Sequence, residues 1–172
     1  RLKVILDHGA YIMGPEVFEL EEKLSEYTGV KHTVSCSSGT DALLIPLMAW
    51  DGGPGGAVFT TPFTYVATAE VISLVGATPV FVDVYDSTFN IDCEKLESAI
   101  QHTISKGELT PKAIIPVDLF GVPARYRLIE KIAKRYNLKI IEDAAQSFGA
   151  KIGDKKVGTV GDVAATSFYP AK

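Results

Sequence analysis

The last residue of the chain, Lys172, directly follows the stretch SFYPA and could act as a nucleophile. A lysine at a chain end is usually a solvated tail residue. However, the apolar run VAATSFY predicts a strand just before it, and a partly desolvated lysine amine has a lowered pKa. Such an amine can form an imine with an aldehyde. The position of Lys172 alone leaves both interpretations open.

A second candidate is Asp143, at the end of the apolar stretch KIIED. Successive side chains of a strand point to opposite faces, so Glu142 and Asp143 cannot both face the same side. A buried aspartate needs a cation or several hydrogen-bond donors. Asp143 is therefore either a cap of the following turn or the anion that keeps a pyridine nitrogen protonated.

The third feature is the stretch SSGT, residues 37–40, between a predicted strand and a predicted helix. Free N–H groups at the start of a helix suit a phosphate, although Thr40 or Ser38 could equally be an ordinary N-cap. The segment lacks the glycine spacing and the lysine of a P-loop or dinucleotide fingerprint. A phosphate cradle, a carboxylate for a pyridinium and an imine-forming lysine are together the needs of pyridoxal 5′-phosphate (PLP).

Strands and helices must alternate along the chain to position these residues. Helices are predicted in GPEVFELEEKLSEYTG, from about Thr40, after Pro62, from Cys93 behind an Asp92 cap, and in ARYRLIEKIAKRYN. Strands are predicted in KHTVSC, VFTT, TPVFVDV, KAIIPVDL, KIIEDAA and VAATSFY, and a hairpin in AKIGDKKVG. Continuous apolar runs are typical of strands buried on both faces, so we expect an α/β fold with a mostly parallel sheet between helix layers. The three chemical features all fall beyond strand carboxyl ends, where such sheets bind ligands.

Composition excludes several classes of function. The 172 residues are 47% hydrophobic, enough for one sizeable core, and length favours one domain. A net charge of −4 without a basic stripe argues against nucleic-acid binding. Cys36 and Cys93 have no metal-ligand spacing and predict reduced thiols in the cytoplasm, with no bound metal. No apolar run approaches the roughly 20 residues that span a membrane.

Four motifs in the order CSSGTDAL, PFTYVATAEVISLVGATPVFVDV, IEDAAQSFGA and GDVAATSFYPAK resemble the DegT/DnrJ/StrS family of PLP-dependent sugar aminotransferases. The resemblance runs from about Asp7 to the end of the chain. It implies that residues 1–172 form the PLP-binding large domain of the type I transferase fold, truncated before a small C-terminal domain. It also implies a homodimer, because a partner subunit completes the active site in family members.

The resemblance assigns roles around the cofactor ring. Lys172 matches the lysine that binds PLP as an imine, and Asp143 matches the aspartate on the pyridine nitrogen. Gln146 matches the residue placed against the ring and its phenolic oxygen. Tyr65 occupies the place of an aromatic side chain stacked on the pyridine, although at the start of a helix it could equally be a core aromatic.

The same resemblance identifies residues that would bind the cofactor phosphate and the substrate. Gly39 and Thr40 match the phosphate-binding turn, and Ser167 matches a serine that reaches the same phosphate. Gly9 and Tyr11 lie in the segment DHGAYIMGPEV, which is similar to the segment that approaches the nucleotide sugar. Asp118 departs from the family pattern, because a histidine is frequent there.

The activity implied is transfer of an amino group from an amino acid, with glutamate as the expected donor, to a keto group of a nucleotide-linked sugar. Lys172 and Asp143 would be the catalytic residues. UDP-linked 3-keto sugars for bacterial surface polysaccharides, including lipopolysaccharide, are the nearest match. Two alternatives within the fold remain open: a PLP-binding regulatory or sensor protein, and a sugar dehydratase. Dehydratases of the family carry a histidine in place of the lysine, so Lys172 argues against the second.

Overall fold

The computed structural model of the chain describes residues 1–170 and 172. The chain divides into two compact units, residues 1–35 and residues 36–172. The prediction of one PLP-binding domain over residues 1–172 stays a prediction.

The first unit contains two helices, α1 (Leu2–His8) and α2 (Pro15–Thr28). Proline at the first position of α2 has the backbone angle of a helix and lacks only an N–H that would be unpaired there. Gly29 ends α2 with φ 86°, a left-handed conformation that glycine adopts without a steric cost. The predicted helix is therefore confirmed, whereas the sequence analysis did not anticipate α1.

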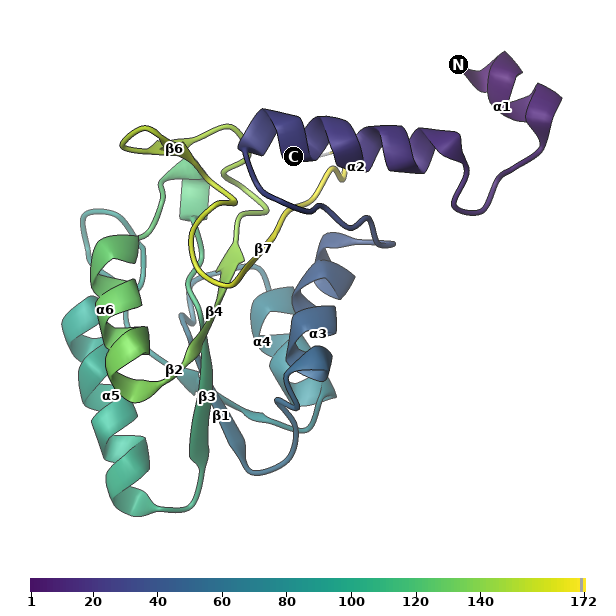
Figure 1. Ribbon diagram of the computed structural model, residues 1–172. Coiled ribbons are helices and arrows are strands. Elements are labelled where there is room, and N and C mark those ends of the chain that lie inside the picture. The colour runs from purple at the N-terminus through teal and green to yellow at the C-terminus, as the bar shows by residue number, and fades with distance from the viewer. Residues whose placement is uncertain (171) are drawn as a thin grey trace. The chain divides into compact units, whose positions relative to one another are not determined.

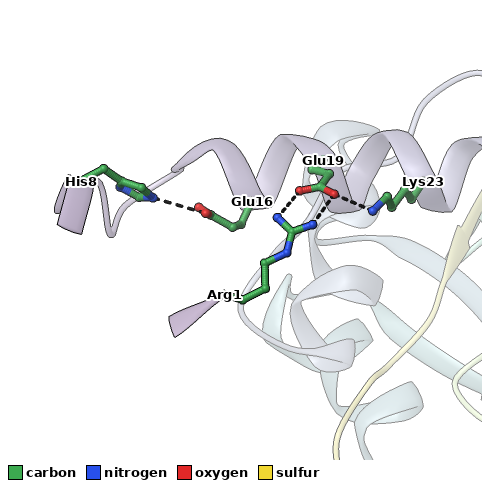
Figure 2. A network of polar contacts seen from close by, with 5 residues as sticks. All are labelled: Arg1, His8, Glu16, Glu19 and Lys23. Atoms are coloured by element: carbon green, nitrogen blue, oxygen red, sulfur yellow. Dashed lines mark hydrogen bonds and ion pairs between the residues drawn. The ribbon is translucent and has the colours of Figure 1, made fainter. Parts of the chain in front are cut away.

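Ion pairs connect the start of α1 to α2 (Figure 2). Both terminal nitrogens of Arg1 donate to Glu19 at 2.6 Å, and Lys23 donates to the same carboxylate at 2.5 Å. These hydrogen bonds lower the pKa of Glu19 to about 2. His8 lies 3.3 Å from Glu16. All these side chains are at least partly exposed to solvent, so such pairs contribute little to stability.

The second unit is built on a five-stranded parallel sheet in the order β2-β1-β3-β4-β7. The strands of this sheet are β1 (Gly56–Thr60), β2 (Thr78–Phe81), β3 (Thr110–Ile115), β4 (Lys139–Asp143) and β7 (Val163–Ala165). Two short antiparallel strands, β5 (Lys151–Ile152) and β6 (Lys155–Lys156), form the predicted hairpin. The mostly parallel α/β fold is confirmed.

Helices cover both faces of this sheet (Figure 1). On one face lie α3 (Gly39–Ala49) and α4 (Ala67–Leu74), and on the other α5 (Cys93–Lys106) and α6 (Tyr126–Tyr136), which follows the short 3-10 helix η1 (Leu119–Gly121). Alternate residues of the central strands enter two separate cores. Val58 and Ile141 pack with α3 and α4, whereas Phe59 and Ile140 pack with α5 and α6. The result is the expected three-layer arrangement.

Two predicted strands differ from the structure. KHTVSC forms no strand: Val34 is 80% exposed, and the N–H of Ser35 donates to Glu21 at 2.7 Å rather than to a neighbouring strand. The last strand ends at Ala165, so SFY lies outside it and Phe168 is exposed. Apolar, β-branched residues favour a strand only where a partner strand is in reach.

None of the described helices combines the length and the apolar character that a membrane span requires.

Candidate active site at the carboxyl edge of the sheet

The carboxyl ends of the parallel strands meet at one edge of the sheet. β1 and β3 are neighbours there, but the chain leaves β1 toward α4 on one face and leaves β3 toward α6 on the other. Such a divergence of two neighbouring connections is where open α/β sheets bind ligands.

Asp143, the last residue of β4, is a buried acid at this edge, with 5% of its surface exposed. Thr68 of α4 donates its hydroxyl to Oδ2 at 2.8 Å, and the N–H of Ala145 donates to Oδ1 at 3.3 Å. Burial raises the pKa of Asp143, while these two hydrogen bonds and the charge of Lys172 oppose the rise.

Glu142 faces the opposite side of the same strand. Its Oε2 accepts from the N–H of Gly158 at 3.0 Å, and its Oε1 has no hydrogen-bond partner. The alternation predicted for Glu142 and Asp143 is thus present, with Asp143 on the side of α4. Glu142 is fully buried, a feature that the sequence analysis left without a role.

The start of α3 reaches the end of β7. Ser38 is the N-cap, with its hydroxyl accepting from the N–H of Asp41 at 3.1 Å, and the Asp41 carboxylate in turn accepts from Ser38 and Ser37. A Cβ added to Gly39 would lie 2.9 Å from Cβ of Ser167, closer than side chains approach. The absence of a side chain at Gly39 is therefore what lets Ser167 lie beside the first turn of α3, where Thr40 follows.

Gln146 lies in the loop after β4, half-buried, and its Oε1 accepts from the N–H of Phe120 at 3.0 Å. Because a backbone N–H can only donate, the amide oxygen must face Phe120. Its NH₂ group is then the donor that remains for another ligand. Tyr65 precedes α4 and is 67% exposed, so it is not a core aromatic.

The remaining predicted residues lie at the ends of the chain. Lys172 is exposed, and its backbone N–H donates to the carbonyl of Tyr169 at 2.8 Å. Gly9 ends α1 with φ 68°, and Tyr11 is exposed just after it. Both belong to the first unit, so their part in substrate binding stays a prediction.

Sequence reasoning missed an aromatic group in the second unit. The rings of Phe63, Phe89 and Phe120 lie 5.3 to 6.4 Å apart. Phe89 and Phe120 both have left-handed backbones, with φ of 58° and 56°. Asn90 connects their loops, because its side chain donates to the carbonyl of Val122 at 2.9 Å and accepts from the N–H of Leu119 at 3.3 Å. No single segment of sequence carries this signal.

A pocket of about 410 Å³ lies at the opposite edge, beside the first residues of β3 and β4. Trp50, Thr110 and Lys139 are among its lining residues, and none of the predicted site residues is. Among the described residues no group of three or more His, Cys, Asp or Glu side chains could hold a metal ion.

A buried acid, an open helix start and a lysine at the carboxyl edge of a parallel sheet are the parts of a PLP-dependent enzyme of the type I fold. The profile of the DegT/DnrJ/EryC1/StrS aminotransferase family matches residues 1–172. The chain belongs to this family.

Two solved structures share the fold. A DegT DnrJ EryC1 StrS aminotransferase from Brucella abortus is 57% identical with a TM-score of 0.97, over 99% of this chain and 46% of that one. The Bacillus subtilis protein ntda, solved with bound cofactor PMP, is 35% identical with a TM-score of 0.89, over 99% and 37%. The cofactor of the family is PLP, of which PMP is the aminated form.

Among curated relatives, the UDP-2-acetamido-2-deoxy-3-oxo-D-glucuronate aminotransferase of Pseudomonas aeruginosa is 50% identical over 98% of this chain and 45% of its own length. Other relatives are named for GDP-linked and dTDP-linked sugars, and one from Geobacillus stearothermophilus is named a pleiotropic regulatory protein. The chain spans less than half the length of these relatives.

The residues at the carboxyl edge fit PLP. The buried carboxylate of Asp143 accepts hydrogen bonds from Thr68 and Ala145 but forms no ion pair with any described residue, and a protonated pyridine nitrogen would supply a cation in direct contact. The helix start beside Gly39 and Ser167 offers N–H groups and a hydroxyl to a phosphate. The free NH₂ group of Gln146 suits a phenolic oxygen.

Proposed function

We propose that this chain forms the cofactor-binding part of an aminotransferase that moves an amino group from glutamate to the keto group of a UDP-linked sugar. The surface polysaccharides of a bacterium, lipopolysaccharide included, are the proposed destination of the product. The observation that carries the proposal is the buried carboxylate of Asp143 at the carboxyl edge of the sheet, which Thr68 and the N–H of Ala145 hold in place. The name of the Pseudomonas aeruginosa relative supports the class of substrate.

Lys172 and Asp143 have the catalytic roles. PLP, when bound, forms an imine with an amine and draws electrons from the carbon next to it. The Nζ of Lys172 would hold the cofactor at its aldehyde carbon and, as a free amine, would carry a proton to and from the carbon atoms beside the reacting nitrogen. Asp143 holds the proton on the pyridine nitrogen, and Thr68 and Ala145 hold the carboxylate in place.

The other residues orient the cofactor. Gly39, Thr40 and Ser167 bind the phosphate, Tyr65 stacks on the ring, and Gln146 donates to the phenolic oxygen. Gly9 and Tyr11 contact the nucleotide sugar. A homodimer is part of the proposal, with a partner subunit completing the site.

The test is borohydride reduction of the purified protein with PLP, followed by peptide mapping. The pyridoxyl group is expected on Lys172. Lys172→Ala should abolish both the label and the yellow colour, whereas Lys151→Ala in the β5–β6 hairpin should retain both. A label on any other lysine would refute the assignment.

The regulatory alternative has one specific observation in its favour, the name of the Geobacillus stearothermophilus relative. The two functions differ in their response to an amino donor. A transaminase loses the visible absorbance of its PLP imine when glutamate is added, because PLP becomes PMP. A sensor keeps this absorbance with every amino acid tested.

A further inference from the structure

A buried acid that the proposed chemistry does not use is joined by a backbone hydrogen bond to Asp143. Asp118, which follows β3, is fully buried. Its Oδ1 accepts from the N–H of Ala124 at 2.9 Å and from the hydroxyl of Tyr126 at 2.8 Å. Its Oδ2 accepts from the hydroxyl of Ser147 at 3.0 Å. Three donors, from two loops and the first residue of α6, therefore converge on one side chain.

These donors identify Asp118 as the ionised member of a buried pair of acids. A carboxylate that accepts three hydrogen bonds is stabilised in its charged form. The neighbouring Glu142 accepts one hydrogen bond and leaves Oε1 unpartnered. Burial raises the pKa of Asp118 as well, but the hydrogen bonds from Ala124, Tyr126 and Ser147 oppose that rise. Two coupled buried carboxyl groups do not readily ionise together, so the acid with more donors is favoured as the anion and Glu142 as the protonated member. In agreement, burial and the charge of Asp118 raise the pKa of Glu142 to about 8.

The two loops that meet at Asp118 carry residues of the site. One loop, residues 118–125, contains Phe120, and the other, residues 144–148, contains Gln146. A backbone hydrogen bond joins the two loops at their start, where the N–H of Asp118 donates to the carbonyl of Asp143 at 3.1 Å. Farther along, the bond from the N–H of Phe120 to Oε1 of Gln146 joins them again.

The side chain of Asp118 adds a third connection between the loops, through the hydroxyl of Ser147. Ser147, whose hydroxyl donates to Asp118, directly follows Gln146 in the sequence. At the far end of the loop that carries Phe120, the N–H of Ala124 and the hydroxyl of Tyr126 also donate to Asp118 and so fix that end. A loop fixed at both ends holds its backbone N–H groups in place. The N–H of Phe120 determines the orientation of the Gln146 side-chain amide, because it binds the amide oxygen.

We propose that Asp118 is a positioning residue, which as a buried anion fastens these two loops together and thereby orients the NH₂ group of Gln146 toward the cofactor. The role of Gln146 rests on the proposed function, but the link between Asp118 and Gln146 does not. Asp118 touches neither the cofactor nor the substrate, and it acts through the two loops.

The first test needs no cofactor. Hydrogen exchange of the Phe120 amide is measured in the full-length protein without PLP, for the wild type, Asp118→Asn and Gln146→Ala. Gln146→Ala removes the acceptor, so exchange should become about tenfold faster. Asp118→Asn should produce an acceleration of similar size at Phe120 with little change at Phe59 in β1. A Phe120 amide that is unprotected in the wild type, or unchanged in Asp118→Asn, would overturn the proposal.

Ser147→Ala covers the case in which Asp118→Asn does not fold. It removes one donor and keeps the charge, so the acceleration at Phe120 should be smaller and in the same direction. No acceleration in Ser147→Ala would overturn the proposal. Asp162→Asn is the matched control, because Asp162 binds the N–H of Ile140 at the opposite end of β4. It should leave Phe120 unchanged.

The second test uses the dissociation constant of PLP. Asp118→Asn and Gln146→Ala should each weaken binding about tenfold, and the double variant should be no weaker than Gln146→Ala alone. If the losses of PLP-binding free energy in the two single variants added up in the double variant, Asp118 would act independently of Gln146, and the proposal would be overturned. If the wild type binds no PLP, the proposed function fails, while the exchange experiment still decides the positioning role.

Discussion

The hydroxyl of Thr68 donates to Oδ2 of Asp143 at 2.8 Å across 75 positions of the sequence. Both partners are buried, on α4 and at the end of β4. The hydrogen bond keeps the carboxylate oriented and opposes the rise in its pKa that burial causes. A neutral Asp143 could not hold the proton on a pyridine nitrogen, so Thr68 supports the proposed catalytic state.

Thr68→Val should raise the pKa of Asp143, because the side chain keeps its shape but loses its donor. Thr68→Ser, which retains the hydroxyl, should leave the pKa near that of the wild type. The measurement is a ¹³C NMR titration of the aspartate carboxyl carbons without PLP. Equal pKa values in the two variants would contradict this role.

Gly39→Ala should destabilise the protein by about 1–3 kcal/mol, because the new methyl group would crowd the side chain of Ser167. The double-mutant cycle with Ser167→Gly tests the cause. In a Ser167→Gly background, adding Gly39→Ala should cost little free energy of unfolding, since the crowding atoms are gone. Urea unfolding measures all four proteins. An equal cost in both backgrounds would place the strain elsewhere.

Stability should fall with rising pH through the titration of Glu142. Its pKa is raised from 4.5 to about 8, so between these values the folded state holds a proton that the unfolded state has lost. Because the folded state binds more protons, the free energy of unfolding decreases as pH rises, by about 1.4 kcal/mol per unit within this window. The contribution is complete below pH 4.5 and is lost above pH 8.

Glu142→Gln should flatten this dependence between pH 6 and 8, where ordinary carboxyl groups no longer titrate. Glu97→Gln, which removes a carboxylate that pairs with Arg135 on the surface, should not. Chemical unfolding at several pH values provides the slopes. A wild-type slope that Glu142→Gln leaves unaltered would show that another group titrates.

The sequence predicted those elements of the fold whose signal is local. The apolar run of β1 is fully buried, as its composition indicates, and Asp92 caps α5 through the N–H groups of Glu94 and Lys95. The segment KHTVSC has the same β-branched character but forms no strand. The composition of a segment indicates whether it could form a strand. Whether a neighbouring strand is available to pair with it depends on the rest of the fold.

The residues of the candidate site likewise differ in whether the sequence alone predicts them. Asp143 follows from its position at a strand end, and the start of α3 follows from its capping residue Ser38, although the strand predicted before it does not form. Thr68, Asn90 and Asp118 are ordinary polar residues in sequence, and their partners lie 75, 29 and 29 positions away. Hydrogen bonds over such distances depend on the packing of whole elements, which a single sequence does not reveal.

The side chain of Asn90 connects the loops of Phe89 and Phe120 through two hydrogen bonds. Two left-handed phenylalanine backbones cost free energy, and contacts in the surrounding structure must compensate. Asn90→Ala removes both hydrogen bonds and leaves the buried N–H of Leu119 without its acceptor. The expected loss is about 2 kcal/mol.

Asn90→Asp separates the two bonds, because it keeps an acceptor for Leu119 and loses the donor to Val122. In urea unfolding, the wild type should be the most stable of the three proteins, followed by Asn90→Asp and then by Asn90→Ala. Near-ultraviolet circular dichroism of the folded variants should lose part of its phenylalanine signal, since the aromatic rings are no longer held at fixed angles. An unchanged spectrum together with wild-type stability would mean that the aromatic rings hold these loops without Asn90.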